Sequence, residues 1–268
     1  MINVIIFSKD RAAQLDLLLR SFKEYFKEYS LANISVIYSY SLPEFKSGYT
    51  KLESEMENVL FVHDLKYGSF RETVLKSIDT TLPKTMFLVD DILFKDYFSI
   101  QDSEIQILDN EQIIATSLRL WKGIDHCYAS NTPSPPPSFI NKHVWNWTGS
   151  SGDWGYPMSL DGNIFRTDFA CKKFNQINFA NPNQLEAALA AYVDRTKQYM
   201  SCYVQDSKLL NIPANIVQNV YKNRHGSLIS AAELNDAYMQ GKKLSYAHLK
   251  NYQNNTVHVE IALLWTED

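Results

Sequence analysis

Cysteine is scarce in this chain of 268 residues, and its three cysteines are widely separated. Cys127, Cys171 and Cys202 form no C-x-x-C pair, which argues against a disulfide framework or a structural zinc site and favours a reducing compartment. Long apolar runs are also lacking, since no segment approaches the roughly 18 apolar residues of a membrane helix. The first apolar run, at 3–7, is too short for a signal peptide. We therefore expect a cytoplasmic protein, with contact to the inner face of a membrane left open.

Neither sign of charge dominates the composition. The chain has 26 lysines and arginines against 30 aspartates and glutamates, a net charge of −4. Nucleic-acid binding usually needs a basic face, so this balance gives no reason to expect a nucleic acid as partner. Hydrophobic residues make up 45% and charged residues 21%, which is ordinary for a globular protein. The length suffices for a substantial core in one large or two closely fused domains.

Glycine-rich phosphate loops are missing, although a polar turn stands where one would be sought. The apolar run at 3–7 leads into FSKDRAAQL, which matches neither a dinucleotide fingerprint nor a P-loop. This turn contains Ser8, Lys9, Asp10, Arg11 and Gln14. Polar side chains between a strand and a helix favour anion or nucleotide binding. The alternative is a capped helix with solvated charges, and the turn alone does not decide between them.

The first 125 residues alternate between β-rich apolar runs and segments of helical spacing. Expected strands lie at 3–7, 34–40, 59–64, 85–94 and 112–121, and a helix is expected at 70–82. Such alternation predicts an α/β fold with a mostly parallel central sheet flanked by helices. Ligands of such sheets bind at the carboxyl ends of the strands.

The composition changes after about residue 125. The prolines of 130–139 exclude a regular helix or a central strand. Helical patterns follow at 181–200 and 231–252, the second weakened at Gly241, and 256–265 is expected to be a terminal strand. We expect residues 1–125 and 126–268 to form two halves of one compact unit.

Two adjacent aspartates interrupt the apolar segment MFLVDDILF. Asp90 and Asp91 follow a strand-like run, where burial of two carboxylates is costly unless positive charge compensates them. Mg²⁺ and Mn²⁺ take carboxylate oxygens, and with a diphosphate bound they need one or two from the protein. The alternative is a pair of cap or turn residues at the end of a strand.

The polar turn and the later acidic pair together resemble the GT-A glycosyltransferases, most strongly from residue 1 to about 95. The acidic signature of that family is usually D-x-D and binds the metal and the diphosphate of the donor; VDD stands in its place here. The resemblance implies that 1–125 binds a nucleotide sugar and 126–268 an acceptor. We favour Asp91 as the direct metal ligand and Asp90 as a ribose or second contact. The implied nucleotide-sugar site consists of Ser8, Lys9, Asp10, Arg11, Gln14, Asp90 and Arg119, with pairing to a carboxylate inside the fold as the alternative for Arg119.

The second half resembles the acceptor half of inverting GT-A enzymes in GYPMSLDGNIFRTDF and the NPNQLEAALAAY that follows. The match implies Glu186 as the base, because a carboxylate can remove the proton of an acceptor hydroxyl. Asp161 is the competing base or an acceptor contact, although Asp-Gly is also a common turn. Trp154 and Tyr156 are expected to bind the acceptor, with burial in the core as the alternative.

A late basic segment, VYKNRHGS, contains His225. The resemblance implies that this histidine returns to the metal, while neighbouring basic residues neutralise the leaving diphosphate. The alternative is a structural or exposed histidine.

We therefore expect a metal-dependent, inverting glycosyltransferase that uses Mn²⁺ or Mg²⁺. Its donor would be a nucleotide diphosphate sugar, its acceptor a carbohydrate or glycolipid, and its role cell-surface polysaccharide or glycan synthesis. Two alternatives remain. A sugar-nucleotide nucleotidyltransferase would normally show a glycine-rich phosphate loop. A non-catalytic carbohydrate-binding protein would use the aromatic region alone.

Overall fold

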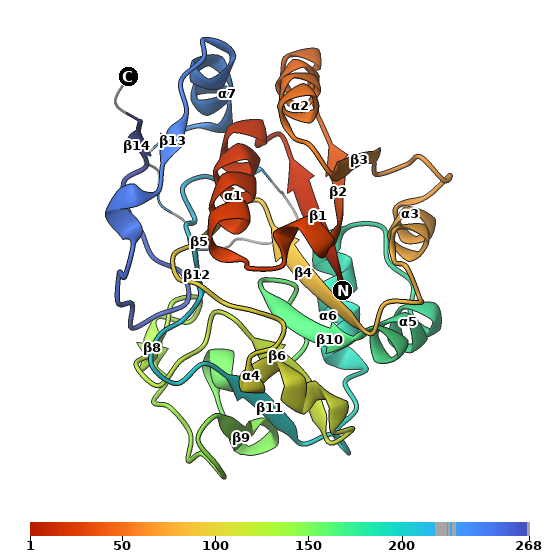
Figure 1. Ribbon diagram of the computed structural model, residues 1–268, viewed down its shortest axis with the longest axis vertical. Helices are drawn as coiled ribbons and strands as arrows, with labels where there is room; N and C mark the ends of the chain where they lie inside the picture. Colours follow the sequence, from red (N-terminus) through yellow and green to blue (C-terminus); the bar gives the residue numbers. More distant parts are fainter. Residues whose placement is uncertain (218–223, 225, 227–228, 267–268) are drawn as a thin grey trace.

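The computed structural model describes residues 1–217, 224, 226 and 229–266 (Figure 1). The helices are α1 (Ala12–Tyr25), α2 (Pro43–Glu55), α3 (Phe70–Ser77), α4 (Ser103–Gln106), α5 (Thr167–Gln176), α6 (Pro182–Ala191) and α7 (Ala231–Met239). The strands are β1 (Ile2–Lys9), β2 (Asn33–Ser39), β3 (Val59–His63), β4 (Lys84–Val89), β5 (Ile92–Phe94), β6 (Ile113–Ser117), β7 (His126–Cys127), β8 (Thr132–Pro133), β9 (Val144–Asn146), β10 (Asn163–Arg166), β11 (Tyr199–Cys202), β12 (Leu209–Asn211), β13 (Leu244–Ser245) and β14 (Leu264–Trp265).

One large sheet organises the molecule, with the strand order β3-β2-β1-β4-β10-β6-β11-β9. The pairs β1–β2, β2–β3, β1–β4 and β6–β11 are parallel, whereas β10 and β9 run antiparallel to their neighbours. Because β10 is antiparallel to both β4 and β6, those two strands point the same way. The predicted α/β class with a mostly parallel central sheet is confirmed.

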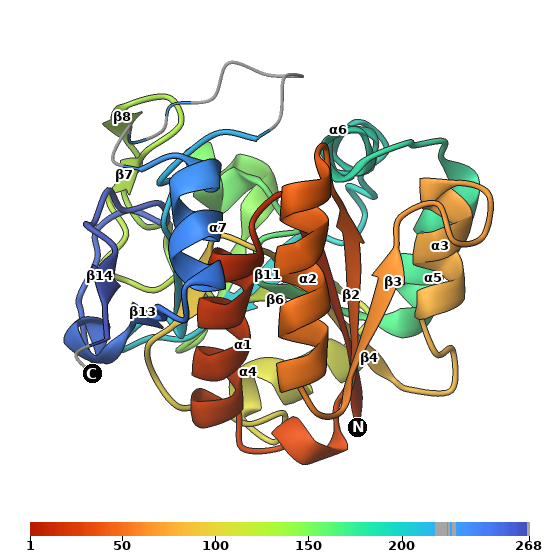
Figure 2. The same cartoon turned by 90° about the horizontal axis from the view of Figure 1, so that it is seen from above.

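Strand β1 shows how the sequence builds three layers. Its side chains alternate between faces, as in every strand, and both faces are buried. Val4 and Ile6 belong to the core beneath α1, α2 and α7, whereas Ile5 and Phe7 belong to the core beneath α3, α5 and α6. Helices therefore cover both faces of the sheet, and Figures 1 and 2 show α1, α2 and α7 packed together on one of them.

Strand β10 joins the second half of the chain to the first. It lies between β4 and β6, with Ile164 opposite Met86 on β4 and opposite Thr116 on β6. The sequence analysis assigned no strand to this segment. The pairing brings Asp161, just before β10, to the carboxyl end of β4. The two predicted halves thus share one sheet.

Two predicted elements of the second half are wrong in extent. The helix expected at 181–200 ends at Ala191, and its last residues belong to strand β11, which pairs with β6. The terminal strand expected at 256–265 is reduced to β14, and Val257–Val259 instead exchange two backbone hydrogen bonds with Asn211 of β12. Strand β14 is short because its partner β13 has only two residues. The helical region expected at 231–252 also ends early: α7 stops at Met239, and β13 follows. The break lies near Gly241, where weakening was predicted and where φ is +95°.

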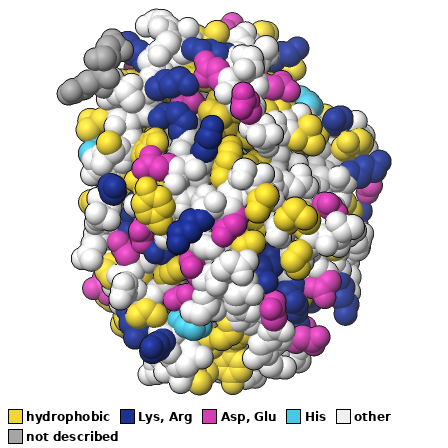
Figure 3. Space-filling view, viewed as in Figure 1, with side chains coloured by type: hydrophobic (Ala, Val, Ile, Leu, Met, Phe, Trp, Pro, Cys, Tyr) yellow, Lys and Arg dark blue, Asp and Glu magenta, His cyan; other side chains and the backbone are white. Residues whose placement is uncertain are grey.

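The surface carries charges of both signs. Lysine and arginine side chains lie interspersed with aspartate and glutamate on the face seen in Figure 3. Within the described ranges, no helix has both the length and the apolar character needed to cross a bilayer.

Candidate active site

A cavity of about 410 Å³ opens at the carboxyl ends of β1, β2 and β4. The first half of the chain lines it with the turn after β1 and with the Asp90–Asp91 pair that follows β4. The second half contributes Asp161, the first turn of α6 and His258. This is the edge at which parallel sheets bind ligands, because several strands end there together.

Asp90 anchors the turn after β1. Its Oδ2 accepts hydrogen bonds from Ser8 Oγ (2.9 Å) and from the backbone N–H of Lys9 (3.0 Å). Its Oδ1 accepts one from Arg11 Nη1 at 2.9 Å. Both carboxylate oxygens are therefore engaged, which compensates the cost of burying the charge.

Asp91 is bound more loosely than its neighbour. Its Oδ1 accepts a hydrogen bond from Asn211 Nδ2 at 3.2 Å, and its Oδ2 lies 3.8 Å from Arg11 Nη1. Burial raises the pKa of Asp91 to about 7, which the charge of Arg11 opposes and the charge of Asp161 reinforces. The Asp91 carboxylate is therefore short of positive charge and retains capacity to accept another ligand.

Both predicted base residues lie in this cavity. The backbone N–H of Leu160 donates to Glu186 Oε1 at 3.1 Å, and Asp161 Oδ2 lies 3.4 Å from Arg119 Nη1. Burial raises the pKa of Asp161, and the nearby charge of Glu186 raises it further. Burial also raises the pKa of Glu186, while the charge of Arg119 opposes the shift. Raised carboxyl pKa values in a cleft are typical of acid–base groups.

Arg119 is buried beside these carboxylates and is not among the residues that line the cavity. Its guanidinium lies 3.4 Å from Asp161 and 3.7 Å from Asp153. This matches the second interpretation offered by the sequence, pairing with carboxylates inside the fold. Its positive charge therefore acts on the Asp161 carboxylate, although Arg119 itself does not line the cavity.

His258 is a cavity residue that the sequence analysis missed. Its Nε2 lies 3.9 Å from Asp161 Oδ2, and its ring stacks on Tyr128 with 5.5 Å between centroids. Burial, helped by the charge of Arg119, lowers the pKa of His258 to about 4, so the imidazole is neutral at pH 7. No local pattern marks this residue, because its place depends on the bridge between Asn211 and His258. The predicted His225 lies outside the described residues.

A divalent cation fits these residues best as an ion shared with a bound diphosphate. Within the described part of the chain, histidine, cysteine, aspartate and glutamate form no group of three that could hold a metal by themselves. Asp90 already accepts three hydrogen bonds, whereas Asp91 accepts one. Mg²⁺ and Mn²⁺ usually keep waters and take substrate phosphates, so one carboxylate is enough to place them.

The remaining lining near β1, β2 and β3 has a different chemistry. Phe7, Ile37 and Phe70 supply apolar surface, and Ser39 and Asp64 supply polar groups. The sequence analysis did not single these residues out. The signal was available for Ser39 and Asp64, because both stand at or just after the ends of parallel strands.

Several predicted residues lie outside the cavity lining. The Oδ1 of Asp10 accepts a hydrogen bond from the Ser41 backbone N–H at 2.6 Å, and the Oε1 of Gln14 accepts one from Asn215 Nδ2 at 3.4 Å. Trp154 is fully buried against Trp145, with 5.0 Å between ring centroids. Tyr156 is half-buried. The predicted residues that the structure does bring together are Ser8, Lys9, Arg11, Asp90, Asp91, Asp161 and Glu186.

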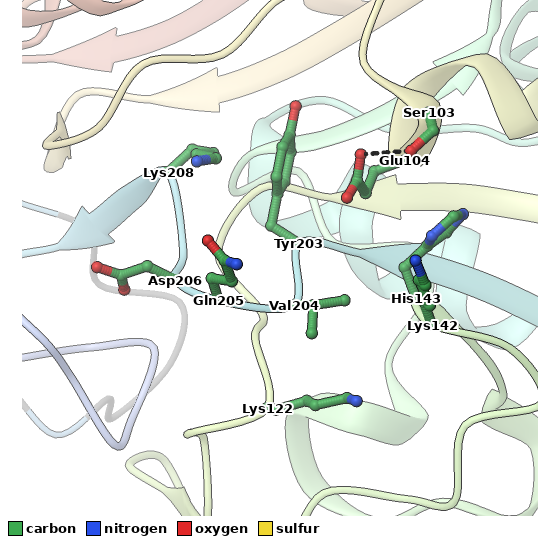
Figure 4. Close-up of a pocket in the computed structure, with 10 residues that line it drawn as sticks. All are labelled: Ser103, Glu104, Lys122, Lys142, His143, Tyr203, Val204, Gln205, Asp206 and Lys208. Carbon is green, nitrogen blue, oxygen red and sulfur yellow. Dashed lines mark hydrogen bonds between the residues drawn. The ribbon is translucent and has the colours of Figure 1, made fainter.

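A second cavity, of about 480 Å³, is lined by the side chains drawn in Figure 4. Lys122, Lys142 and Lys208 line it, together with Glu104 and Asp206. None of the predicted catalytic, metal or nucleotide residues lies in this lining. The cavity with the aspartate pair is therefore the candidate active site.

Comparison with known proteins agrees with this chemistry. No family model matches the chain. The bifunctional glycosyltransferase pgtA of Dictyostelium discoideum is 26% identical over 279 residues, which cover 91% of this chain and 36% of the relative. The chain thus spans about a third of the length of the relative that it matches. The match confirms the resemblance to glycosyltransferases and supports the prediction of a transferase.

Solved structures show weaker likenesses. S. aureus TarS 1–349 in complex with UDP has a TM-score of 0.49 and 15% identity, covering 78% of this chain and 60% of that one. The mannosyltransferase PcManGT from Pyrobaculum calidifontis, in complex with GDP-Man and Mn²⁺, has a TM-score of 0.34 and 14% identity, covering 47% and 42%. The roles of individual residues here rest on the geometry of this chain.

Proposed function

We propose that this protein transfers a sugar from a nucleotide diphosphate sugar to a hydroxyl group of a carbohydrate acceptor. One observation carries the proposal. A single cavity is lined by the Asp90–Asp91 pair and the basic turn after β1, and also by the carboxylates of Asp161 and Glu186. Groups suited to binding a diphosphate and groups that can accept a proton therefore line the same cavity.

The donor would lie along the edge formed by β1, β2 and β4. Phe7, Ile37 and Phe70 offer apolar surface to a nucleobase, and Ser39 and Asp64 offer hydrogen bonds. The diphosphate would then reach the turn after β1, where Lys9 and Arg11 supply positive charge. The cavity of about 410 Å³ falls in the usual range for small-molecule sites.

Asp91 is the residue that would hold Mn²⁺ or Mg²⁺, together with the diphosphate oxygens and with the neutral imidazole of His258 as a further donor in the same cavity. When bound, the cation supplies a Lewis acid that stabilises charge on the departing diphosphate. Asp90 keeps the turn after β1 in place through its three hydrogen bonds.

The acceptor hydroxyl would lie between the donor sugar and the α6 wall. Glu186 accepts the hydroxyl proton as the oxygen attacks the anomeric carbon and the bond from that carbon to the diphosphate oxygen breaks. Attack from the side opposite the leaving group inverts the anomeric centre. Asp161 orients the acceptor or takes the base role itself. Trp154 is not included in this acceptor site, because it is buried in the core.

A donor screen tests the proposal. UDP, GDP and CDP are added separately to the protein, with and without Mn²⁺, and the melting temperature is measured. At least one nucleotide is expected to stabilise the protein, and more so with Mn²⁺. Hydrolysis of the matching sugar nucleotides then identifies the donor.

A response to glycans alone would indicate a binding protein, and turnover of a nucleoside triphosphate with a sugar phosphate would indicate a nucleotidyltransferase. Lys208→Met, in the second cavity, is the control variant and should respond like the wild type.

A further inference from the structure

Arg11 lies where a cation bound by the aspartate pair would be expected. Its Nη1 donates to Asp90 Oδ1 at 2.9 Å and lies 3.8 Å from Asp91 Oδ2. One guanidinium nitrogen therefore approaches an oxygen of each carboxylate. The side chain is only 10% exposed, so its charge is poorly screened by solvent.

The guanidinium is held on its other side as well. Arg11 Nε donates to Asn215 Oδ1 at 2.8 Å, and Nη2 donates to the backbone carbonyl of Asn215. All three nitrogens of the group are thus engaged in defined contacts, which suits the rigid, forked geometry of arginine. Asn215 is itself buried and also donates to the Ile229 carbonyl at 3.2 Å. These contacts orient the guanidinium towards the aspartate pair.

Electrostatic repulsion makes Arg11 and a divalent ion compete for the aspartate pair. A divalent ion bound to Asp91 would lie within a few ångströms of the Arg11 charge, in a buried setting where like charges repel strongly. Because the arginine partly neutralises these carboxylates, they attract a divalent cation less strongly. Occupation by one positive group therefore weakens occupation by the other.

We propose that Arg11 is a built-in counter-cation of the Asp90–Asp91 pair, and that a divalent metal binds Asp91 in competition with it. The free protein then holds the metal weakly, and loss of the arginine strengthens metal binding. The inference rests on the cation-binding part of the proposed function and not on sugar transfer. It differs from a simple diphosphate-binding role, which would leave the affinity for the metal alone unchanged.

The test measures Mn²⁺ binding without any nucleotide, from the electron paramagnetic resonance signal of the free ion. Arg11→Met removes the charge and keeps an unbranched side chain, and it is expected to bind Mn²⁺ at least tenfold more tightly than the wild type. Arg11→Lys keeps one charge and should lie between the two. The matched control is Arg20→Met on α1, the helix that Arg11 precedes. Arg20 pairs with buried Asp16 at 2.7 Å, outside the cavity lining, and its loss should leave Mn²⁺ affinity unchanged.

A double variant locates the ion. Arg11→Met combined with Asp91→Asn is expected to lose the gain in affinity, because the carboxylate that receives the metal is gone. Equal or weaker Mn²⁺ binding by Arg11→Met would overturn the proposal, and so would a gain that persists in the double variant. If Arg11→Met fails to fold, Arg11→Lys alone decides, and its affinity must exceed that of the wild type. If the Mn²⁺ measurements overturn this proposal while sugar transfer proceeds without Mn²⁺, the proposed reaction still stands. If the donor screen shows no response, the Mn²⁺ measurements on Arg11→Met are not affected.

Discussion

At the scale of single residues, Glu186 and Asp161 share one environment and have different partners. Glu186 receives a backbone hydrogen bond from Leu160, whereas Asp161 lies close to Arg119 and His258. The charge of Arg119 lowers the pKa of both carboxyl groups against the effect of burial. We keep Glu186 as the proposed base, as the resemblance implies, and kinetics decides between the two.

Replacement of the two carboxylates tests that assignment. Glu186→Gln is expected to lower kcat by at least about 100-fold, since general-base catalysis contributes that order, while the affinity for nucleotide changes little. Asp161→Asn is expected to raise the acceptor KM more than it lowers kcat. Steady-state kinetics with varied acceptor separates the two effects. The reverse pattern would transfer the base role to Asp161.

The pH dependence of turnover follows from the same carboxyl group. A base must be ionised to work, and burial raises the pKa of Glu186 above its ordinary 4.5. The rate should therefore fall as pH decreases, with the acidic limb of kcat lying above pH 4.5. Measurement of kcat across the pH range in constant ionic strength shows the limb. Its disappearance in Glu186→Gln would support the assignment, and an unchanged limb in that variant would contradict it.

Replacing Asp91, with Asp96 as the matched control, tests which residue holds the cation. Asp91→Asn should remove most of the Mn²⁺-dependent part of nucleotide binding, a loss of at least about tenfold, because the amide lacks the charge that hard cations require. Asp96→Asn should have no such effect, since Asp96 pairs with Lys208 in a partly exposed position. Calorimetric titration with nucleotide, with and without Mn²⁺, measures both. Equal behaviour of the two variants would refute the metal assignment.

At the scale of elements, the packing of α2 depends on a missing side chain. A Cβ on Gly48 would lie 2.4 Å from Asn235 Oδ1 on α7 and 2.9 Å from Ala12 Cβ on α1. Both distances are closer than side chains tolerate, so the glycine lets three helices meet. The layer that covers β1 on this face depends on that approach.

Gly48→Ala therefore has two opposing effects on stability. Alanine favours a helix by about 1 kcal/mol over glycine, but overpacking a tight contact costs about 1–3 kcal/mol. We expect a net loss in the free energy of unfolding, measured by urea denaturation. Ser47→Ala, on the exposed neighbouring position of the same helix, should be neutral or slightly stabilising. A stabilised Gly48→Ala variant would show that α7 moves aside without cost.

At the scale of the whole molecule, the active site reduces stability. Asp91, Asp161 and Glu186 all have pKa values raised by burial. A raised carboxyl pKa means that the folded state takes up protons more readily than the unfolded state. These groups therefore disfavour folding above their folded pKa, and the penalty disappears as pH falls towards their ordinary values.

Asp161→Asn should reveal this cost. At pH 8 the variant is expected to melt about 2–4 °C above the wild type, the usual shift for about 1 kcal/mol in a chain of this size. At pH 4 the two proteins should melt together, because the wild-type carboxyl is then protonated in the folded state. Differential scanning calorimetry measures both, with exposed Glu57→Gln as the control. A destabilised Asp161→Asn at pH 8 would mean that the pair with Arg119 outweighs the burial of charge.

Local patterns accounted for much of the architecture. The apolar runs that became β1, β2, β3 and β4 are short, β-rich and bounded by polar turns, so each is visible in a window of a few residues. Strand β10 was missed because its four residues carry no comparable pattern, and the strand expected at 256–265 was overestimated because an apolar run does not reveal the length of its partner.

The polar turn after β1 and the aspartates after β4 could be placed at the ends of strands from the sequence, because a polar residue that ends an apolar run is a local signal. The residues that contact them depend on the tertiary structure. Arg11 contacts Asn215 across 204 positions, and His258 reaches Asp161 through its bridge to β12. Such contacts depend on strand order and register across the whole sheet, and a single sequence carries no local record of those. The positive charge beside the carboxylate pair therefore comes from the turn next to it in space. The other carboxylates of the cavity come from the second half of the chain.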